Sequence, residues 1–116
     1  MSPKKDERVA PPPVGDEWDV RFGTKEAAAS WDELVRAAKT NARRAYDLMR
    51  TAPGQDPDTR HHRLKGPLTS GVHRGKELPQ WQIEVTGSGR IWYLLDEEHH
   101  TVWVQYASLK HPKKTE

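Results

Sequence analysis

Three side chains near the C-terminal end of the chain could take part in phosphate chemistry. Arg90 follows a Gly-Ser-Gly turn sequence (87–89), Glu84 precedes that turn, and His111 lies in a short basic tail. A guanidinium group presents paired donors to phosphate oxygens and keeps its charge. Histidine titrates near neutrality, so His111 could act as a general acid or base. Glu84 could serve as a base or orient Arg90, and the alternative for Arg90 is a surface ion pair with Glu84.

Positive charge is concentrated in the part of the chain that leads up to Arg90. Between Arg60 and Arg90 there are six basic and two acidic side chains, whereas residues 1–16 and 17–56 are each balanced. A local positive field of this kind favours a polyanionic partner. The phosphate contacts that we expect are four basic side chains, for each of which a solvated surface position is the alternative: Arg63, Lys65, Lys110 and Lys113.

The sequence argues against a metal site. It contains no cysteine, and its two histidine pairs are His61-His62 and His99-His100. Neighbouring side chains of a strand point to opposite faces, so neither pair can chelate a metal locally. No carboxylate–histidine spacing completes a site, and we expect neither a metal nor another cofactor.

The length of 116 residues gives room for one compact domain. Residues 1–15 combine mixed charge with a Pro-Pro-Pro run, which predicts an unstructured leader before a single domain over 16–116. No stretch has the apolar character of a signal peptide or the length of a membrane span. We therefore expect a cytoplasmic protein without membrane contact.

The apolar pattern alternates between strand and helix periods along the chain. Residues 17–22 predict a strand, and Thr24 is a candidate helix N-cap. A helical stripe covers 25–49, and because Thr40-Asn41 offers a second N-cap, one long helix and a helical hairpin within 25–52 are both allowed. Four further strands are predicted at 60–68, 80–86, 90–96 and 101–107, with a glycine- and charge-rich loop over 69–79. This order predicts an α+β fold with a twisted, mostly antiparallel sheet and helices on one face.

The turn lengths predict the faces of the last three strands. A three-residue turn at 87–89 and a four-residue turn at 97–100 place Tyr93 and Tyr106 on the core face. Trp92 and Trp103 then lie on the outer face, where they could stack on bases or contact a partner. The same register brings the tail, 108–113, to the Arg90 end of the sheet.

These features together resemble the RelE/ParE superfamily of bacterial toxins, the toxic halves of type II toxin–antitoxin pairs. A strand, a helical region, a strand ending Leu64-Lys65-Gly66 and a closing β-strand stand in the order of that family. The turn and strand Gly-Ser-Gly-Arg-Ile-Trp-Tyr (87–93) and the ending Lys-His-Pro-Lys (110–113) add to the resemblance, which covers about 17–114.

The resemblance implies a RelE-like fold and a metal-independent endoribonuclease that cuts messenger RNA, often on the ribosome, and arrests growth until an antitoxin masks it. In that family the arginine that starts the equivalent strand contacts the scissile phosphate, and Arg90 matches it. His111 matches a residue after the last strand that contributes to cleavage, and Arg63 and Lys65 match the basic strand that grips the RNA. Such cleavage needs a base for the 2′-hydroxyl, a cation for the phosphorane and an acid for the 5′-oxygen.

One departure keeps other functions open. RelE-like enzymes often carry lysines at the positions of Gln82 and Glu84. A ParE-like inhibitor of DNA gyrase and an inactive relic that only binds an antitoxin therefore remain alternatives. In each case the partner that we expect is a small antitoxin, through which the chain would reach operator DNA; mRNA and the ribosome are the partners of the nuclease alone.

Overall fold

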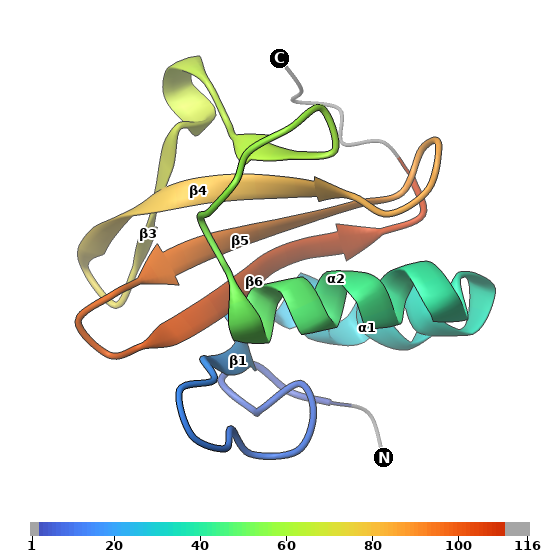
Figure 1. Cartoon of the computed structure of the whole chain (residues 1–116), viewed down its shortest axis with the longest axis horizontal. Coiled ribbons are helices and arrows are strands. Elements are labelled where there is room, and N and C mark those ends of the chain that lie inside the picture. Colours follow the sequence, from blue (N-terminus) through green and yellow to red (C-terminus); the bar gives the residue numbers. More distant parts are fainter. Residues whose placement is uncertain (1–2, 111–116) are drawn as a thin grey trace.

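The structure, a computed structural model, describes residues 3–110, and it has an α+β architecture (Figure 1). A six-stranded, mostly antiparallel sheet carries two helices on one face, as the sequence predicts. The elements are β1 (Asp19–Phe22), α1 (Lys25–Ala37), α2 (Lys39–Thr51), β2 (His61–Arg63), the 3-10 turn η1 (Gly66–Leu68), β3 (Ser70–His73), β4 (Lys76–Glu84), β5 (Arg90–Asp96) and β6 (Thr101–Ser108).

The helical region is a hairpin, which decides between the two arrangements that the sequence allows. Thr24 caps α1 by accepting a hydrogen bond from the Ala27 amide at 3.0 Å, as predicted. The second cap predicted at Thr40-Asn41 is wrong. The chain turns instead at Ala38, whose φ of −139° and ψ of 58° are not helical and which has no side chain able to cap. Asn41 uses its side-chain amide elsewhere, donating to the carbonyl oxygen of Val85 on the sheet.

The core lies between the helical hairpin and one face of the sheet. The helices bury alanines and a few large side chains, among them Trp31, Leu34 and Met49. These pack on a face that includes Ile91 and Tyr93, both fully buried. Burial of this apolar surface is the main force that holds the helices on the sheet.

The strand order is β1-β6-β5-β4-β2, with β3 also paired to β4. Only β1 runs parallel to its neighbour, and Val20 lies opposite Val102 in that pair. A parallel pair requires a crossover connection, which the helical hairpin supplies between β1 and the rest of the sheet. The first and last strands of the domain are therefore adjacent.

The pairing of β4 with β5 differs by two residues from the predicted one. A three-residue turn would place Ile83 opposite Tyr93, but Ile83 lies opposite Ile91 and Glu84 opposite Arg90. The turn is longer because Val85 and Thr86 also belong to it. A shift of two residues leaves each side chain on its predicted face, because strand side chains alternate with period two.

A bulge in β6 overturns the prediction that Tyr106 is a core residue. Tyr93 pairs with Val104 and Trp92 with Tyr106, so Gln105 has no opposite residue on β5. Beyond this point every side chain of β6 changes face. Ala107 enters the core instead, and the Tyr106 ring lies on the outer face with its centroid 5.6 Å from that of Trp92.

Residues 69–79 form a hairpin, not the predicted loop, and β2 is shorter than predicted. β3 pairs with the first half of β4 around a turn at Arg74 and Gly75, whose φ angles are 53° and 79°. Residues 76–79 of β4 have no partner on β5. The hairpin covers part of the outer face, where Leu78 forms a small cluster with Leu94 and Trp103.

Residues 6–9, part of the leader predicted to be unstructured over 1–15, lie along β1. The Asp6 and Val9 amides donate to the carbonyl oxygens of Phe22 and Val20, and Phe22 donates back to Glu7. Arg8 also forms an ion pair with Asp19 at 2.9 Å. Residues 6–9 therefore extend the sheet beyond β1. No helix in the described part of the chain is long and apolar enough to cross a membrane.

Candidate functional site at the β4–β5 turn

Arg90 stands at the first position of β5, but its guanidinium group turns back into the preceding turn. One terminal nitrogen, Nη1, donates to the carbonyl oxygens of Thr86 and Gly89 at 3.0 Å each and of Gly87 at 3.3 Å. The residue is only 8% exposed. Arg90 therefore holds the β4–β5 turn in shape, a role that the sequence does not reveal.

The remaining donors of Arg90 are less well occupied. Its Nη2 atom lies 3.6 Å from a carboxylate oxygen of Glu84, which is an ion pair too long for a good hydrogen bond. Its Nε atom is buried and has no hydrogen-bond partner in the described residues. An incoming phosphate would compete with Glu84 for Nη2, so Glu84 acts as an internal counterion at this position.

The tail begins beside Arg90, as the register of the strands predicts. Arg90 pairs with Ser108, and the Ser88 hydroxyl donates to the Leu109 carbonyl oxygen at 2.6 Å. Lys110 follows with an exposed side chain. His111 and Lys113, a predicted catalytic and a predicted RNA-binding residue, lie outside the described residues.

The other predicted RNA contacts are spread over the neighbouring edge and face. Arg63 is exposed at the end of β2 and donates from Nε to the carbonyl oxygen of Thr69 at 2.8 Å. Lys65 is exposed just before η1. Trp92 shares the outer face with Gln82, and its indole N–H donates to the Gln82 side chain at 2.8 Å.

Two tryptophans of the outer face, Trp92 and Trp103, are buried. Trp92 is 9% exposed and Trp103 is 6% exposed, so neither offers an open stacking surface. The imidazole of His73 stacks on Trp103 with ring centroids 4.0 Å apart. The stacking of these tryptophans on bases, or their contact with a partner, stays a prediction.

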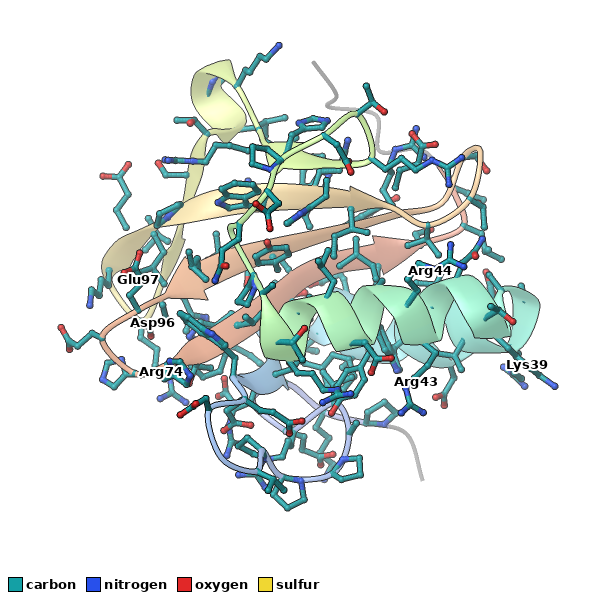
Figure 2. All side chains as sticks on the ribbon, in the orientation of Figure 1. Lys39, Arg43, Arg44, Arg74, Asp96 and Glu97 are labelled. Carbon is teal, nitrogen blue, oxygen red and sulfur yellow. The ribbon has the colours of Figure 1, made fainter. Side chains whose placement is uncertain are left out.

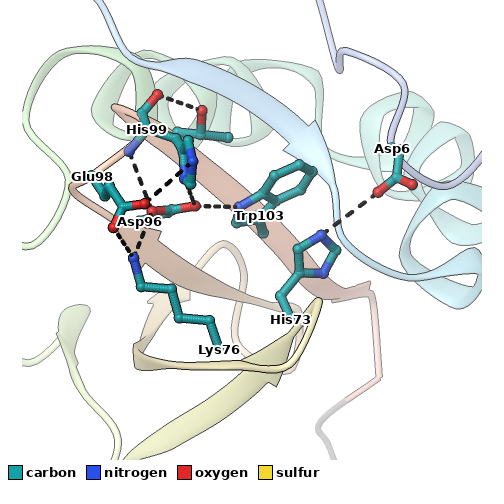
Figure 3. A network of polar contacts seen from close by, with 8 residues as sticks. Asp6, His73, Lys76, Asp96, Glu98, His99 and Trp103 are labelled. Atoms are coloured by element: carbon teal, nitrogen blue, oxygen red, sulfur yellow. Dashed lines mark hydrogen bonds and ion pairs between the residues drawn. The ribbon is translucent and has the colours of Figure 1, made fainter.

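A polar network at the opposite end of the sheet is not predicted by the sequence (Figure 3). Asp96 is almost fully buried and accepts hydrogen bonds from the His99 ring at 2.9 Å and from the Trp103 indole at 3.2 Å. Burial alone would raise the pKa of Asp96, but these hydrogen bonds outweigh it and hold the pKa below its ordinary value. Lys76 completes the network by binding Glu98 at 2.9 Å.

A second polar pair lies inside the core between β2 and β5. The ring Nε2 of His61 is 2.7 Å from the Tyr93 hydroxyl, which also accepts a hydrogen bond from the Gly54 amide at 2.8 Å. Burial lowers the pKa of His61 and raises that of Tyr93. The strand period assigns Tyr93 correctly to the core, but it gives no sign of its polar partners.

Within residues 3–110 no group of three or more histidine, aspartate or glutamate side chains could hold a metal ion.

In comparisons with known proteins, no family model, no curated protein and no solved structure matches the chain.

Proposed function

We propose that the chain is a RelE/ParE-like toxin of a bacterial toxin–antitoxin pair, acting in the cytoplasm as a metal-independent mRNA endoribonuclease that an antitoxin neutralises. The observation that carries the proposal is the meeting of Arg90 with the start of the basic tail at one end of the sheet. A first strand, a helical hairpin and an antiparallel sheet with the helices on one face provide the frame on which a RelE-like site is built.

In this proposal Arg90 binds the scissile phosphate through Nη2, while its Nη1 contacts keep the group in place. A guanidinium fixed in advance loses little conformational freedom when it binds a phosphate. Glu84 occupies part of the site in the free protein and must release Nη2 when RNA binds. His111 would then protonate or deprotonate the reacting oxygens, with Arg63, Lys65, Lys110 and Lys113 as backbone contacts.

One observation favours a second candidate, a protein that binds without cleaving RNA. Arg90 is buried, hydrogen-bonded to its own turn and paired with the Glu84 carboxylate. Such contacts are typical of an arginine with a structural role. A ParE-like gyrase inhibitor or an inactive, antitoxin-binding relic fits that arrangement.

Inducible expression in a bacterium, with growth curves and mapping of transcript ends, tests these functions. The nuclease predicts growth arrest and new transcript ends, and both effects should disappear in Arg90→Gln. The matched control Glu97→Gln changes an exposed side chain at the other end of the sheet and should behave as the wild type. Because Arg90 also stabilises its turn, circular dichroism must show that the variant is folded.

Other outcomes separate the alternatives. Growth arrest with unchanged transcripts would refute the nuclease, and a supercoiling assay would then test gyrase inhibition. Unimpaired growth at full expression would identify an inactive relic. Glu84→Gln provides a second test, since removing the counterion should preserve or increase cleavage if Glu84 only competes with RNA, and abolish it if Glu84 is the general base.

A further inference from the structure

A pocket of about 350 Å³ opens between α2 and the edge of the sheet formed by β2 and β4. Its floor is apolar and is made by Ala45 and Leu48 from α2, Ile83 from β4 and Val85 from the β4–β5 turn. The volume lies within the range of pockets that hold small organic ligands.

The rim of this pocket carries two arginines without partners. Arg44 and Arg60 are both exposed and line the pocket from α2 and from the start of β2. Among the described residues their guanidinium groups form no ion pair or hydrogen bond, unlike Arg43 and Arg50, which both bind Asp47. Figure 2 shows Arg44 on the edge of α2 nearer the sheet and Arg43 on the opposite edge.

A buried imidazole adds an unsatisfied donor to the pocket wall. The Tyr93 hydroxyl accepts the Gly54 N–H, so its own hydrogen is free to be donated to Nε2 of His61. In the tautomer that accepts this hydrogen at Nε2, the ring hydrogen is on Nδ1, which is buried and has no partner in the described residues. His61 is 5% exposed and lines the pocket, so a ligand acceptor would relieve the cost of this lone donor.

Three carboxylates, those of Asp56, Asp58 and Glu84, also line the pocket. Asp58 already accepts from the backbone amides of Arg60 and His61 at 2.8 Å each. Glu84 faces Arg90 at 3.6 Å. Asp58 keeps its negative charge in these hydrogen bonds, so carboxylates also oppose the two free guanidinium groups. A phosphate must therefore bind where Arg44 and Arg60 contact it directly.

We propose that this pocket binds a nucleoside monophosphate, free or as one nucleotide of a single-stranded RNA. The base lies on the apolar floor against Leu48 and Ile83, with an acceptor on its edge near His61. The phosphate is bound by Arg44 and Arg60, since guanidinium groups present paired donors to its oxygens. The site is separate from the outer face that carries Trp92, and it does not depend on the toxin function.

Isothermal titration of the full chain with AMP, GMP, CMP and UMP tests the proposal, with adenosine and inorganic phosphate as partial ligands. At least one nucleotide should bind more tightly than either partial ligand. Arg44→Gln and Arg60→Gln should each weaken that binding about tenfold, because each removes a charge-assisted contact to the phosphate. Arg36→Gln, an exposed arginine of α1 outside the pocket, should leave it unchanged.

The ring signals of His61 in an NMR titration give a second readout that needs no variant, and they should shift with the nucleotide. The proposal is overturned if inorganic phosphate binds as tightly as every nucleotide, if the two arginine variants match the Arg36→Gln control, or if the His61 ring does not respond.

A single-stranded RNA dodecamer distinguishes the source of the nucleotide. Tighter binding than AMP, lost in the same variants, identifies RNA, and equal binding identifies a free nucleotide.

Discussion

Arg90 is a single residue whose side chain can serve two purposes. Its Nη1 atom donates to three carbonyl oxygens of the turn, of which that of Gly89 also accepts from the Val85 amide. Its removal costs these hydrogen bonds, and because Thr86 and Gly87 are partly exposed, water can replace the donor at a cost of about 0.5–1.5 kcal/mol for each bond. Loss of function in an Arg90 variant is therefore meaningful only beside a measurement of folding, which is why the growth experiment includes one.

Two buried histidines make the stability of the fold depend on pH. Burial lowers the pKa of both His61 and His73 below the ordinary value of 6.5. Below pH 6.5 the unfolded chain therefore binds more protons than the folded one.

We predict that the free energy of unfolding falls as the pH drops through 6.5 and levels off below the two lowered pKa values. Above pH 6.5 these two groups contribute no pH dependence. Urea denaturation at a series of pH values measures the effect, and NMR titration of the imidazole signals assigns it. Titration of both rings at or above 6.5 would contradict this explanation.

Among the secondary-structure elements, a bulge in β6 and the β3–β4 hairpin determine which side chains of the sheet are exposed. The bulge at Gln105 moves Tyr106 out of the core. The Gln105 side chain lies against Gly23, where an added Cβ atom would collide with it. The β3–β4 hairpin covers the outer face around Trp103. Neither feature follows from the alternation of apolar residues, because both depend on contacts between strands that are distant along the chain.

Gly75 in the turn of that hairpin and Gly87 in the β4–β5 turn provide a matched pair of glycine substitutions. Gly75 has a φ of 79°, which a side chain disfavours, whereas Gly87 has an ordinary φ and open space where an added Cβ atom would lie. We predict that Gly75→Ala destabilises the protein by about 1 kcal/mol. Gly87→Ala should be neutral or slightly stabilising, because it restricts the unfolded chain.

Thermal and urea denaturation of both variants measure this difference. An equal effect of the two substitutions would show that the β3–β4 turn does not keep its left-handed conformation in solution. A loss confined to Gly75→Ala, accompanied by greater exposure of Trp103 fluorescence, would show that the hairpin is what covers the outer face.

In the molecule as a whole, the N-terminal segment is part of the domain. It pairs with the outer edge of β1, and Asp6 reaches further to Arg74 of the β3–β4 turn at 3.3 Å. Covering an exposed sheet edge in this way protects it from pairing with other chains. The segment thus links the first strand of the fold to the hairpin on its outer face.

Removal of residues 1–9 should weaken β1 locally. The Phe22 amide donates to the Glu7 carbonyl oxygen, so its hydrogen exchange should become at least about tenfold faster in the truncated chain. The Gly23 amide, bonded to Val104 within the sheet, is the internal control and should change less. Equal protection of Phe22 with and without the segment would show that the N-terminal pairing is absent in solution.

Patterns along the chain were enough to predict the class of fold and most of the core. Period-two and helical patterns identified the helical region, Thr24 as its cap and β5 from Arg90 to Asp96, because these depend on neighbours along the chain. The same patterns placed Ile91, Tyr93 and Val104 on the buried face even where the pairing was two residues off. They also brought the tail to Arg90.

The roles of the polar and aromatic side chains became visible only in three dimensions. Arg90 turns into its own turn, Trp92 and Trp103 are covered, and His61 meets Tyr93 across two strands and forms a pocket wall with α2. These outcomes depend on contacts between segments distant in sequence, on one bulge and on a hairpin folded over the sheet. Local patterns carry no record of such contacts, because the residues that meet are brought together only when the sheet and helices pack.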